Sequence, residues 1–148
     1  MLEGALSGLK IVELSERVAG PFCTKVMADM GAEVIKIEQP GIGDVARTRG
    51  PFPGDEPHPD RSALFLYLNT NKIGISLDIT KPEGVGLFRD LVKEADILVE
   101  TQRPGFLDSL GVGYDSLHHI APQLIVTSIS PFGQTGPYKD YKAYNLNT

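Results

Sequence analysis

The chain has 148 residues, about the length of one domain, and 41% of them are hydrophobic and 22% charged, as in an ordinary globular protein. Its net charge of -5 excludes the basic footprint of a nucleic-acid-binding protein, so we expect no nucleic-acid partner. No apolar run is long enough for a membrane span, no leader sequence is visible, and the single cysteine cannot form an internal disulfide. These features predict a cytoplasmic protein that does not bind a membrane.

Apolar runs of strand type and of helix type alternate along the chain. Short runs rich in branched residues predict strands at residues 9–14, 34–38, 73–78, 97–100 and 124–130. Apolar residues at helical spacing predict helices at residues 21–30, 62–68, 80–94, 106–110 and 114–120. The alternation predicts an α/β fold, a Rossmann-like and mostly parallel sheet of about five strands with helices on both faces.

Two segments interrupt this alternation. Residues 39–61 are rich in glycine, proline and polar residues and predict a long loop, which in a compact domain is commonly functional or mobile. Residues 131–137 form a second loop rich in glycine and proline. This second loop is either a mobile cover over a site or a linker between domains.

Ligands of parallel sheets bind beyond the carboxyl ends of the strands, so candidate sites lie in the loops that follow strands. Residues 15–21 lead into a helix whose first amides could bind a phosphate, with Gly20 admitting the ligand, or they form a plain turn. Arg103 is either a ligand for a phosphate or carboxylate or a solvated turn residue. Lys36 and Glu38 end the second strand, where the acid could bind a ribose hydroxyl or both could be surface residues.

A catalytic group is not evident in the sequence. Cys23 lies in the first turn of the first predicted helix, but none of His58, His118 and His119 has a spacing that pairs it with the thiol, so we expect a core cysteine. The same histidines form no metal-ligand pattern, and we predict no metal site. From its residues alone, the chain is an α/β ligand-binding unit.

A set of short motifs covers essentially the whole chain. In chain order they are GLKIVEL at 8–14, AGPFCT at 19–24, ADMGAEVIKIE at 28–38, GD at 43–44, NK at 71–72, LD at 77–78, PEG at 82–84, ADILVE at 95–100, RPG at 103–105, LG at 110–111 and FGQTGPY at 132–138. Each motif is weak, but the ordered set is specific. It resembles the type III CoA transferases, the CaiB/BaiF family.

The resemblance implies an enzyme that moves CoA between carboxylic acids through an aspartyl anhydride and an aspartyl-CoA thioester. Its substrates are then an acyl-CoA and a carboxylic acid, with no metal and no permanently bound cofactor. It implies a homodimer of two interlocked chains, whose contact surfaces would be exposed here as apolar patches. It also implies that residues 1–148 are a truncated N-terminal CoA-binding domain. The nucleophilic aspartate is expected beyond Thr148, so we expect no catalytic residue in this chain and no activity of the chain alone.

The resemblance also places the CoA-contacting positions of the family on this sequence. They are Val18, Ala19, Gln39, Leu77, Thr80, Thr101, Gln102, Arg103, Ser109, Leu110, Lys142, Ala143 and Tyr144. Some members have Asn-Phe at 101–102, an arginine at 109 and a basic residue at 39. This chain therefore places fewer positive charges around the phosphates of CoA.

Two other functions are compatible with the sequence. The α-methylacyl-CoA racemases share the family fold and use a histidine at the position of Tyr144, so the tyrosine disfavours racemase chemistry, which needs an acid and base near neutral pKa. The other alternative is a non-catalytic module that binds CoA or a nucleotide.

Overall fold

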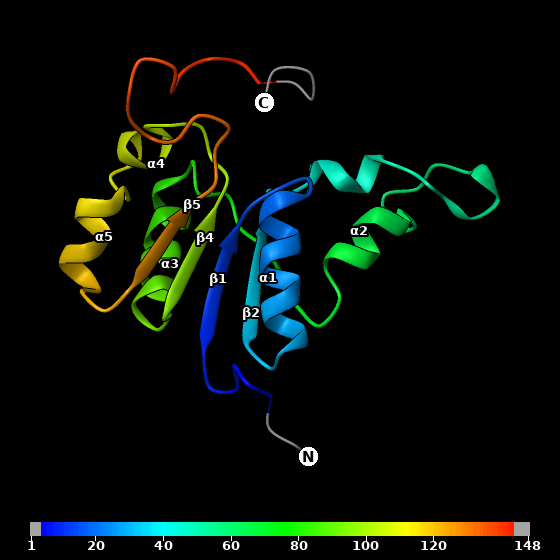
Figure 1. The fold of residues 1–148 in the computed structure, drawn as a ribbon, viewed down its shortest axis with the longest axis horizontal. Coiled ribbons are helices and arrows are strands. Elements are labelled where there is room, and N and C mark those ends of the chain that lie inside the picture. The colour runs from blue at the N-terminus through cyan, green and yellow to red at the C-terminus, as the bar shows by residue number, and fades with distance from the viewer. Residues whose placement is uncertain (1–3, 144–148) are drawn as a thin grey trace.

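The computed structural model of the chain describes residues 4–143. Five strands form one sheet in the order β3-β2-β1-β4-β5, each parallel to its neighbours. Figure 1 shows β2, β1, β4 and β5 side by side. The strands are β1 (Lys10–Leu14), β2 (Glu33–Glu38), β3 (Ile73–Ser76), β4 (Ile97–Glu100) and β5 (Ile125–Ser128). This arrangement confirms the predicted α/β fold with a parallel five-stranded sheet.

Helices cover both faces of the sheet. They are α1 (Ala19–Asp29), α2 (Ala63–Leu68), α3 (Pro82–Lys93), α4 (Phe106–Ser109) and α5 (Tyr114–Ile120). One face packs on α1, and the other packs on α3, α4 and α5. Beside α1, α2 extends away from the sheet, on the right in Figure 1. None of the helices among residues 4–143 is both long and apolar enough to cross a membrane.

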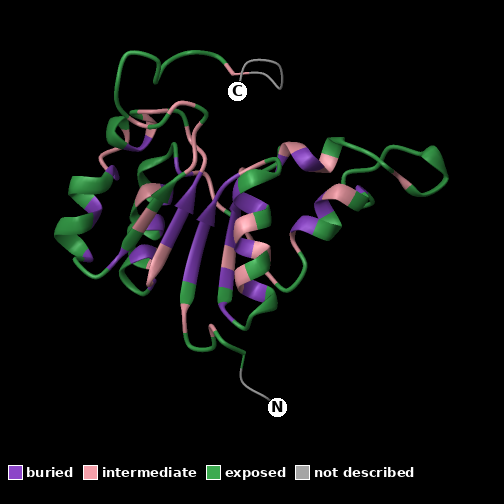
Figure 2. Ribbon diagram, in the orientation of Figure 1, coloured by how far each residue is buried: buried purple, intermediate pink, exposed green. Residues whose placement is uncertain are grey.

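The central strand β1 explains how the two cores are divided. Ile11 points to the α1 side and Val12 to the α3 side, because successive side chains of a strand alternate between faces. Both are buried, as is typical of a parallel strand covered on both faces (Figure 2). By the same alternation Glu13 lies on the α1 side, and it too is fully buried.

The predicted long loop at residues 39–61 has internal structure. It contains the 3-10 helices η1 (Val45–Thr48) and η2 (Pro53–Asp55). Asp44 caps η1 by accepting a hydrogen bond from the Ala46 amide at 2.8 Å, and Ser62 caps α2 by accepting one from the Phe65 amide at 3.1 Å. Ser62 Oγ also donates to the Ala46 carbonyl at 2.7 Å, which ties the segment back on itself. These turns depend on caps and on contacts across the loop, which an apolar pattern does not reveal.

Two strands end two residues earlier than predicted. β3 ends at Ser76 rather than at residue 78, because the Asp78 side chain accepts hydrogen bonds from the amide and hydroxyl of Thr80 and so begins the turn into α3. β5 spans only Ile125–Ser128. The shortened ends place more residues in the loops at the carboxyl edge of the sheet.

Candidate functional site

Two hollows open beyond the carboxyl ends of the strands, around the central strand β1. The larger hollow, of about 770 Å³, lies between the loops that follow β1, β4 and β5. The smaller hollow, of about 80 Å³, lies between the ends of β1 and β2 and the turn before α3. Glu16, Gln102 and Phe106 line both, so the hollows are neighbours. Parallel sheets bind their ligands at such a place.

Most of the predicted CoA-contacting residues line these hollows. The larger hollow brings together Val18, Ala19, Thr101, Gln102, Arg103 and Ala143, and the smaller one brings together Gln39, Leu77, Thr80 and again Gln102. These residues come from segments far apart in the sequence. The structure therefore gathers them into one region at one edge of the sheet.

Three of the four remaining predicted residues, Ser109, Leu110 and Lys142, are not among the lining residues. Ser109 is exposed at the end of α4, where its Oγ donates to the Phe106 carbonyl at 2.6 Å. Leu110 packs against the core on the α3 side of the sheet. Neither residue lines a hollow. Lys142 is exposed and precedes the lining residue Ala143. Tyr144 lies outside the described residues.

The structure adds lining residues that the sequence did not single out. Glu16 and Arg17 follow β1, Phe106 follows the turn at Arg103, and residues 129–131 follow β5. The signal that could have found them is position, because each follows the end of a strand or the turn behind one. Sequence reasoning named the loop after β1 without assigning roles to Glu16 and Arg17.

The loop after β1 is held by hydrogen bonds to its backbone. The Glu16 amide donates to Thr101 Oγ1 at 3.1 Å, and the Arg17 amide donates to Asp44 Oδ1 at 2.9 Å. The Ser15 carbonyl accepts from Lys36 Nζ at 2.8 Å. Side chains from three other segments thus fix the backbone of three successive residues in this loop.

Gly20 has a packing role that the sequence did not reveal. A Cβ atom built on Gly20 would lie 2.4 Å from Ser15 Cβ and 2.9 Å from Thr101 Cγ2, and the residue is buried. Such contacts are too short for a packed interior. The glycine therefore lets the first turn of α1 pack against the ends of β1 and β4, which favours the plain turn among the two alternatives that the sequence left open.

Four charged side chains form a buried charge cluster beneath α1: Glu13, Lys36, Asp44 and Lys72. Lys36 Nζ lies 2.9 Å from Glu13 Oε1 and 2.9 Å from Asp44 Oδ2. Lys72 Nζ lies 2.8 Å from Glu13 Oε2, which also accepts from Thr24 Oγ1 at 2.6 Å. Lys36, which the sequence left open as a surface residue, is only 1% exposed.

Pairing within the cluster shifts the pKa values of Glu13 and Lys72. Burial alone would raise the pKa of Glu13, but Lys36 and Lys72 outweigh it and hold that pKa below its usual value. Burial lowers the pKa of Lys72, although its ion pair with Glu13 opposes the change. Two positive and two negative side chains therefore balance one another away from water.

Glu38 is committed to a partner other than a ribose. Arg47 binds both of its carboxylate oxygens, with Nε 2.6 Å from Oε2 and Nη2 2.8 Å from Oε1. The Asp44 amide also donates to Oε2 at 2.9 Å. Burial raises the pKa of Glu38, but these bonds outweigh it and lower the pKa below its usual value. Such a bidentate pair leaves this carboxylate to organise loop 39–61.

Two guanidinium groups and one carboxylate flank the larger hollow. Arg17 and Arg103 are exposed at its wall, and the Arg103 guanidinium lies 5.9 Å from the centre of the Phe106 ring. Glu16 is half-buried beside them, and burial, followed by the nearby Asp44 carboxylate, raises its pKa above the usual value. The hollow thus combines cationic groups, apolar surface and a titratable acid.

The cysteine and two of the histidines that the sequence offered as chemical groups lie in separate parts of the fold. Cys23 is half-buried in α1, His58 accepts a hydrogen bond from the Asp60 amide, and His118 stacks on Tyr114 in α5. Among residues 4–143, no group of three His, Cys, Asp or Glu side chains is placed to hold a metal ion.

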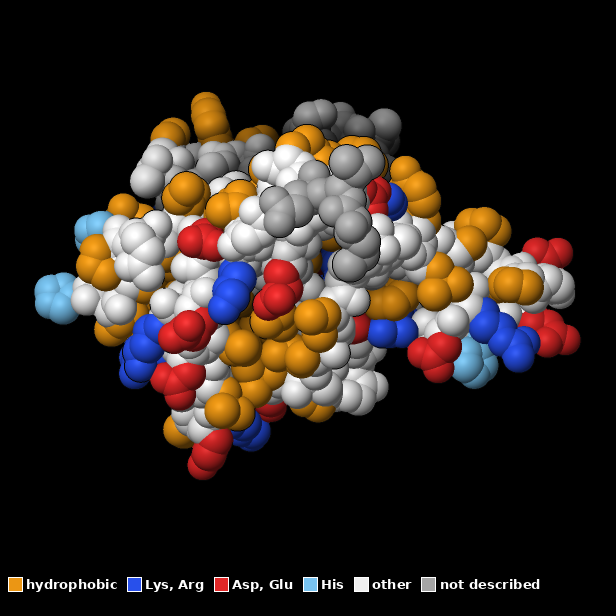
Figure 3. Space-filling view, turned by 90° about the horizontal axis from the view of Figure 1, so that it is seen from below, with side chains coloured by type: hydrophobic (Ala, Val, Ile, Leu, Met, Phe, Trp, Pro, Cys, Tyr) orange, Lys and Arg blue, Asp and Glu red, His pale blue; other side chains and the backbone are white. Residues whose placement is uncertain are grey.

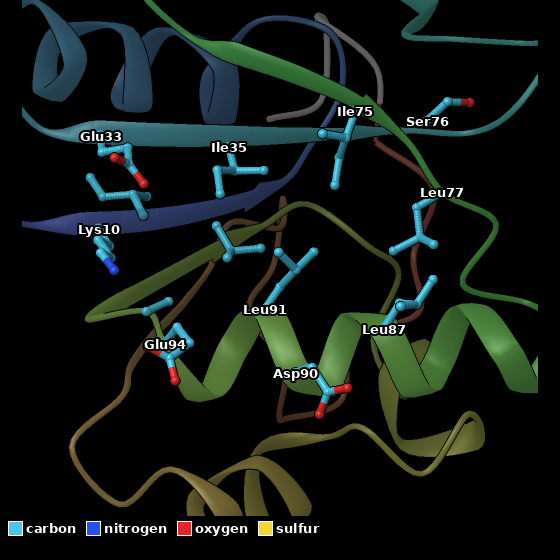
Figure 4. A pocket seen from close by; sticks show the side chains of 13 residues that line it. Lys10, Glu33, Ile35, Ile75, Ser76, Leu77, Leu87, Asp90, Leu91 and Glu94 are labelled. Carbon is cyan, nitrogen blue, oxygen red and sulfur yellow. The ribbon is translucent and has the colours of Figure 1, made fainter.

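An apolar groove of about 500 Å³ lies between the sheet and α3, and Leu77 lines both this groove and the smaller hollow. Leu87 and Leu91 of α3 point toward Ile35 and Ile75 across it (Figure 4). The charged side chains of Lys10, Glu33 and Glu94 lie together at one end of the groove. Apolar side chains also gather on the face seen from below in Figure 3. Apolar side chains thus reach the surface on this side of the sheet.

The five-stranded parallel sheet with helices on both faces defines a Rossmann-like α/β fold, with a hollow at the carboxyl edge of the sheet. A family profile described as CoA-transferase family III matches residues 6–148. The chain belongs to this family, as the ordered motifs predicted.

Relatives and solved structures agree with this assignment. Succinyl-CoA:glutarate CoA-transferase of Homo sapiens is 43% identical over 141 residues, which are 95% of this chain and 31% of that protein. Acetyl-CoA:oxalate CoA-transferase of Acetobacter aceti is 42% identical over 97% of this chain and 36% of its own length. The crystal structure of a CaiB/BaiF family protein from Brucella suis matches with a TM-score of 0.88 and 42% identity, over 98% of this chain and 38% of that one. The chain thus spans about a third of the length of these relatives.

Proposed function

We propose that residues 1–148 are the N-terminal CoA-binding domain of a cytoplasmic CoA transferase, and that acyl-CoA binds in the larger hollow. The observation that carries this proposal is the gathering of Val18, Ala19, Arg103 and Ala143 around one hollow at the carboxyl edge of the sheet. It is supported by relatives named as transferases that use succinyl-CoA, acetyl-CoA or formyl-CoA. These names favour transfer over racemisation.

The lining of the hollow suits the two ends of CoA. Arg17 and Arg103 offer the charge-assisted hydrogen bonds that phosphates accept. Val18, Phe106 and Ile129 offer apolar surface to the uncharged arm that carries the thiol. An acyl-CoA bound in this way has its phosphates near the loops after β1 and β4.

The proposed transfer proceeds by exchange between carboxylates. An aspartate carboxylate attacks the thioester carbonyl, and the CoA thiolate leaves to give a mixed anhydride. The thiolate then attacks the aspartyl carbonyl, which releases the donor acid and leaves an aspartyl-CoA thioester. The acceptor acid repeats the two steps in reverse order and leaves as its CoA thioester, which restores the aspartate.

In our proposal, residues 4–143 supply the CoA-binding residues and not the nucleophile. No aspartate lines either hollow within the described residues. We propose that the aspartate comes from outside residues 4–143, that the working enzyme is a homodimer, and that the chain alone binds CoA without turning it over. CoA is a substrate here, not a resident cofactor.

Replacing Arg103 with glutamine tests the proposed site. Wild-type chain is expected to bind CoA, and Arg103→Gln is expected to weaken binding about tenfold, because one charge-assisted bond to a phosphate is lost. Isothermal titration calorimetry with CoA measures both. Arg89→Gln is the matched control, since Arg89 lies on α3 and donates to the Gly111 carbonyl at 2.8 Å. No binding at millimolar CoA, or an equal loss in both variants, would contradict the proposal.

Glu16 gives the site an expected pH dependence. Because its pKa is raised, first by burial, Glu16 stays protonated to a higher pH than an ordinary glutamate. As the pH rises through that pKa, the carboxylate appears and repels the phosphates, so affinity for CoA is expected to fall. Glu16→Gln is expected to remove this fall and to bind CoA about threefold more tightly at pH 7.

The ratio of the two dissociation constants isolates Glu16. Free CoA titrates in the same way in both experiments, so the protonation of its phosphates in solution cancels in the ratio. Calorimetric titrations from about pH 4 to 8 supply this ratio. A ratio close to one at every pH would show that Glu16 does not face the bound phosphates.

A further inference from the structure

The buried charge cluster reaches the backbone of the loop after β1, which is a wall of the larger hollow. Lys36 Nζ donates to the Ser15 carbonyl at 2.8 Å, and the Arg17 amide donates to Asp44 Oδ1 at 2.9 Å. The Lys36 ammonium and the other Asp44 oxygen are 2.9 Å apart. One ion pair therefore holds the carbonyl of one loop residue and the amide of another.

The conformation of the loop depends on these contacts. Arg17 has a φ of 70°, in the left-handed region that residues other than glycine rarely adopt. Such a conformation persists where the surrounding structure fixes it. Asp44 supplies that constraint directly, because its carboxylate accepts a hydrogen bond from the Arg17 amide itself.

A charged pair is a costly way to fill this space. Apolar side chains of similar volume commonly stabilise a buried site as well or better, so stability alone does not explain Lys36 and Asp44. An apolar residue could fill the volume but could not hold the buried Ser15 carbonyl or the Arg17 amide. What the pair adds is a defined position for the loop.

We infer that Lys36 and Asp44 are positioning residues, which hold the loop after β1 in the shape that receives CoA before CoA arrives. This inference rests on the proposed function, because its benefit is preorganisation of the CoA wall formed by residues 16–19. Neither Lys36 nor Asp44 lines the hollow, so both act through the loop and not on the ligand.

Asp44→Ala and Ser62→Ala form a matched pair for the test. Each substitution removes a buried side chain that hydrogen-bonds to the backbone of Ala46 in η1. Only Asp44 also contacts the loop at residues 15–18. Asp44→Ala is expected to weaken CoA binding by about tenfold, against less than about twofold for Ser62→Ala. Hydrogen exchange of the Arg17 amide, followed by NMR in the unliganded chain, is expected to accelerate about tenfold or more in Asp44→Ala only.

Each outcome decides the inference. Slow exchange of Arg17 in Asp44→Ala, or an equal loss of CoA affinity in both variants, overturns it. If wild-type chain binds no CoA, the proposed function fails, and unchanged exchange at Arg17 separately overturns the anchoring role. Should Asp44→Ala not fold, Asp44→Val, which keeps a similar volume but offers no acceptor to the Arg17 amide, replaces it. Affinity and exchange equal to those of Ser62→Ala would then overturn the inference.

Discussion

Replacement of Lys36 with methionine is expected to lower the free energy of unfolding by about 3–5 kcal/mol, because it removes the cation that two buried carboxylates share and leaves Glu13 with Lys72. Lys36 Nζ lies 2.9 Å from an oxygen of Glu13 and 2.9 Å from an oxygen of Asp44. Methionine fills a similar volume but offers no charge. Urea unfolding followed by far-UV circular dichroism measures the loss at neutral pH.

The size of this effect should depend on pH. In the wild type the pKa of Glu13 is held low, so its contribution to stability is present above the unfolded pKa and is lost as the pH falls through the folded one. Without Lys36, that pKa rises and Glu13 protonates more readily. The difference between wild type and Lys36→Met is therefore expected to shrink as the solution is acidified.

A surface pair provides the control for this variant. Lys93 lies 2.9 Å from Asp90 on the exposed side of α3, and Lys93→Met is expected to cost about 0–1 kcal/mol at any pH. A similar small loss in Lys36→Met, or a loss that does not change with pH, would show that the buried carboxylates find other partners.

Gly20→Ala is expected to destabilise the chain by about 1–3 kcal/mol, although alanine ordinarily favours a helix. The added methyl group would lie 2.4 Å from Ser15 Cβ, so α1 must move away from the end of β1. Because this movement displaces Val18 and Ala19 at the wall of the hollow, CoA affinity is expected to fall about tenfold as well.

Gly86→Ala is the matched control. Gly86 is exposed within α3, and a Cβ there meets no atom within 4 Å. This variant is expected to gain about 0.5–1 kcal/mol and to leave CoA binding unchanged. Urea unfolding and calorimetry on the two variants give opposite signs if packing at Gly20 is as described, and the same sign if it is not.

The elements of the fold were predictable because their signals are local. Branched apolar runs such as residues 9–14 and 97–100 became β1 and β4, and the alternation of strands and helices predicted parallel pairing. The edge of the sheet that carries the site followed from that topology, since all parallel strands end on the same side. The resemblance then supplied individual residues, most of which line the two hollows.

The support beneath the site could not be predicted in this way. Glu13 and Lys36 are charged residues at alternating positions of apolar strands, a pattern also shown by strands with one solvated face. Their burial is compensated by Asp44 and Lys72, which lie in loops distant in sequence. The spacing of these residues in the sequence does not predict which of them form ion pairs. The close packing at Gly20 could not be predicted for the same reason, because Thr101 approaches it from another strand end.

The apolar groove beside α3 affects how the folding of this chain can be followed. Dyes such as ANS bind exposed apolar surface, and their fluorescence is normally taken to report a molten state. Here the native fold already presents such a surface, bounded by Ile35, Ile75 and Leu91. The chain also contains no tryptophan, so its native emission comes from five tyrosines. A dye signal alone therefore does not separate the folded chain from a partly unfolded one, and backbone circular dichroism is the sounder measure.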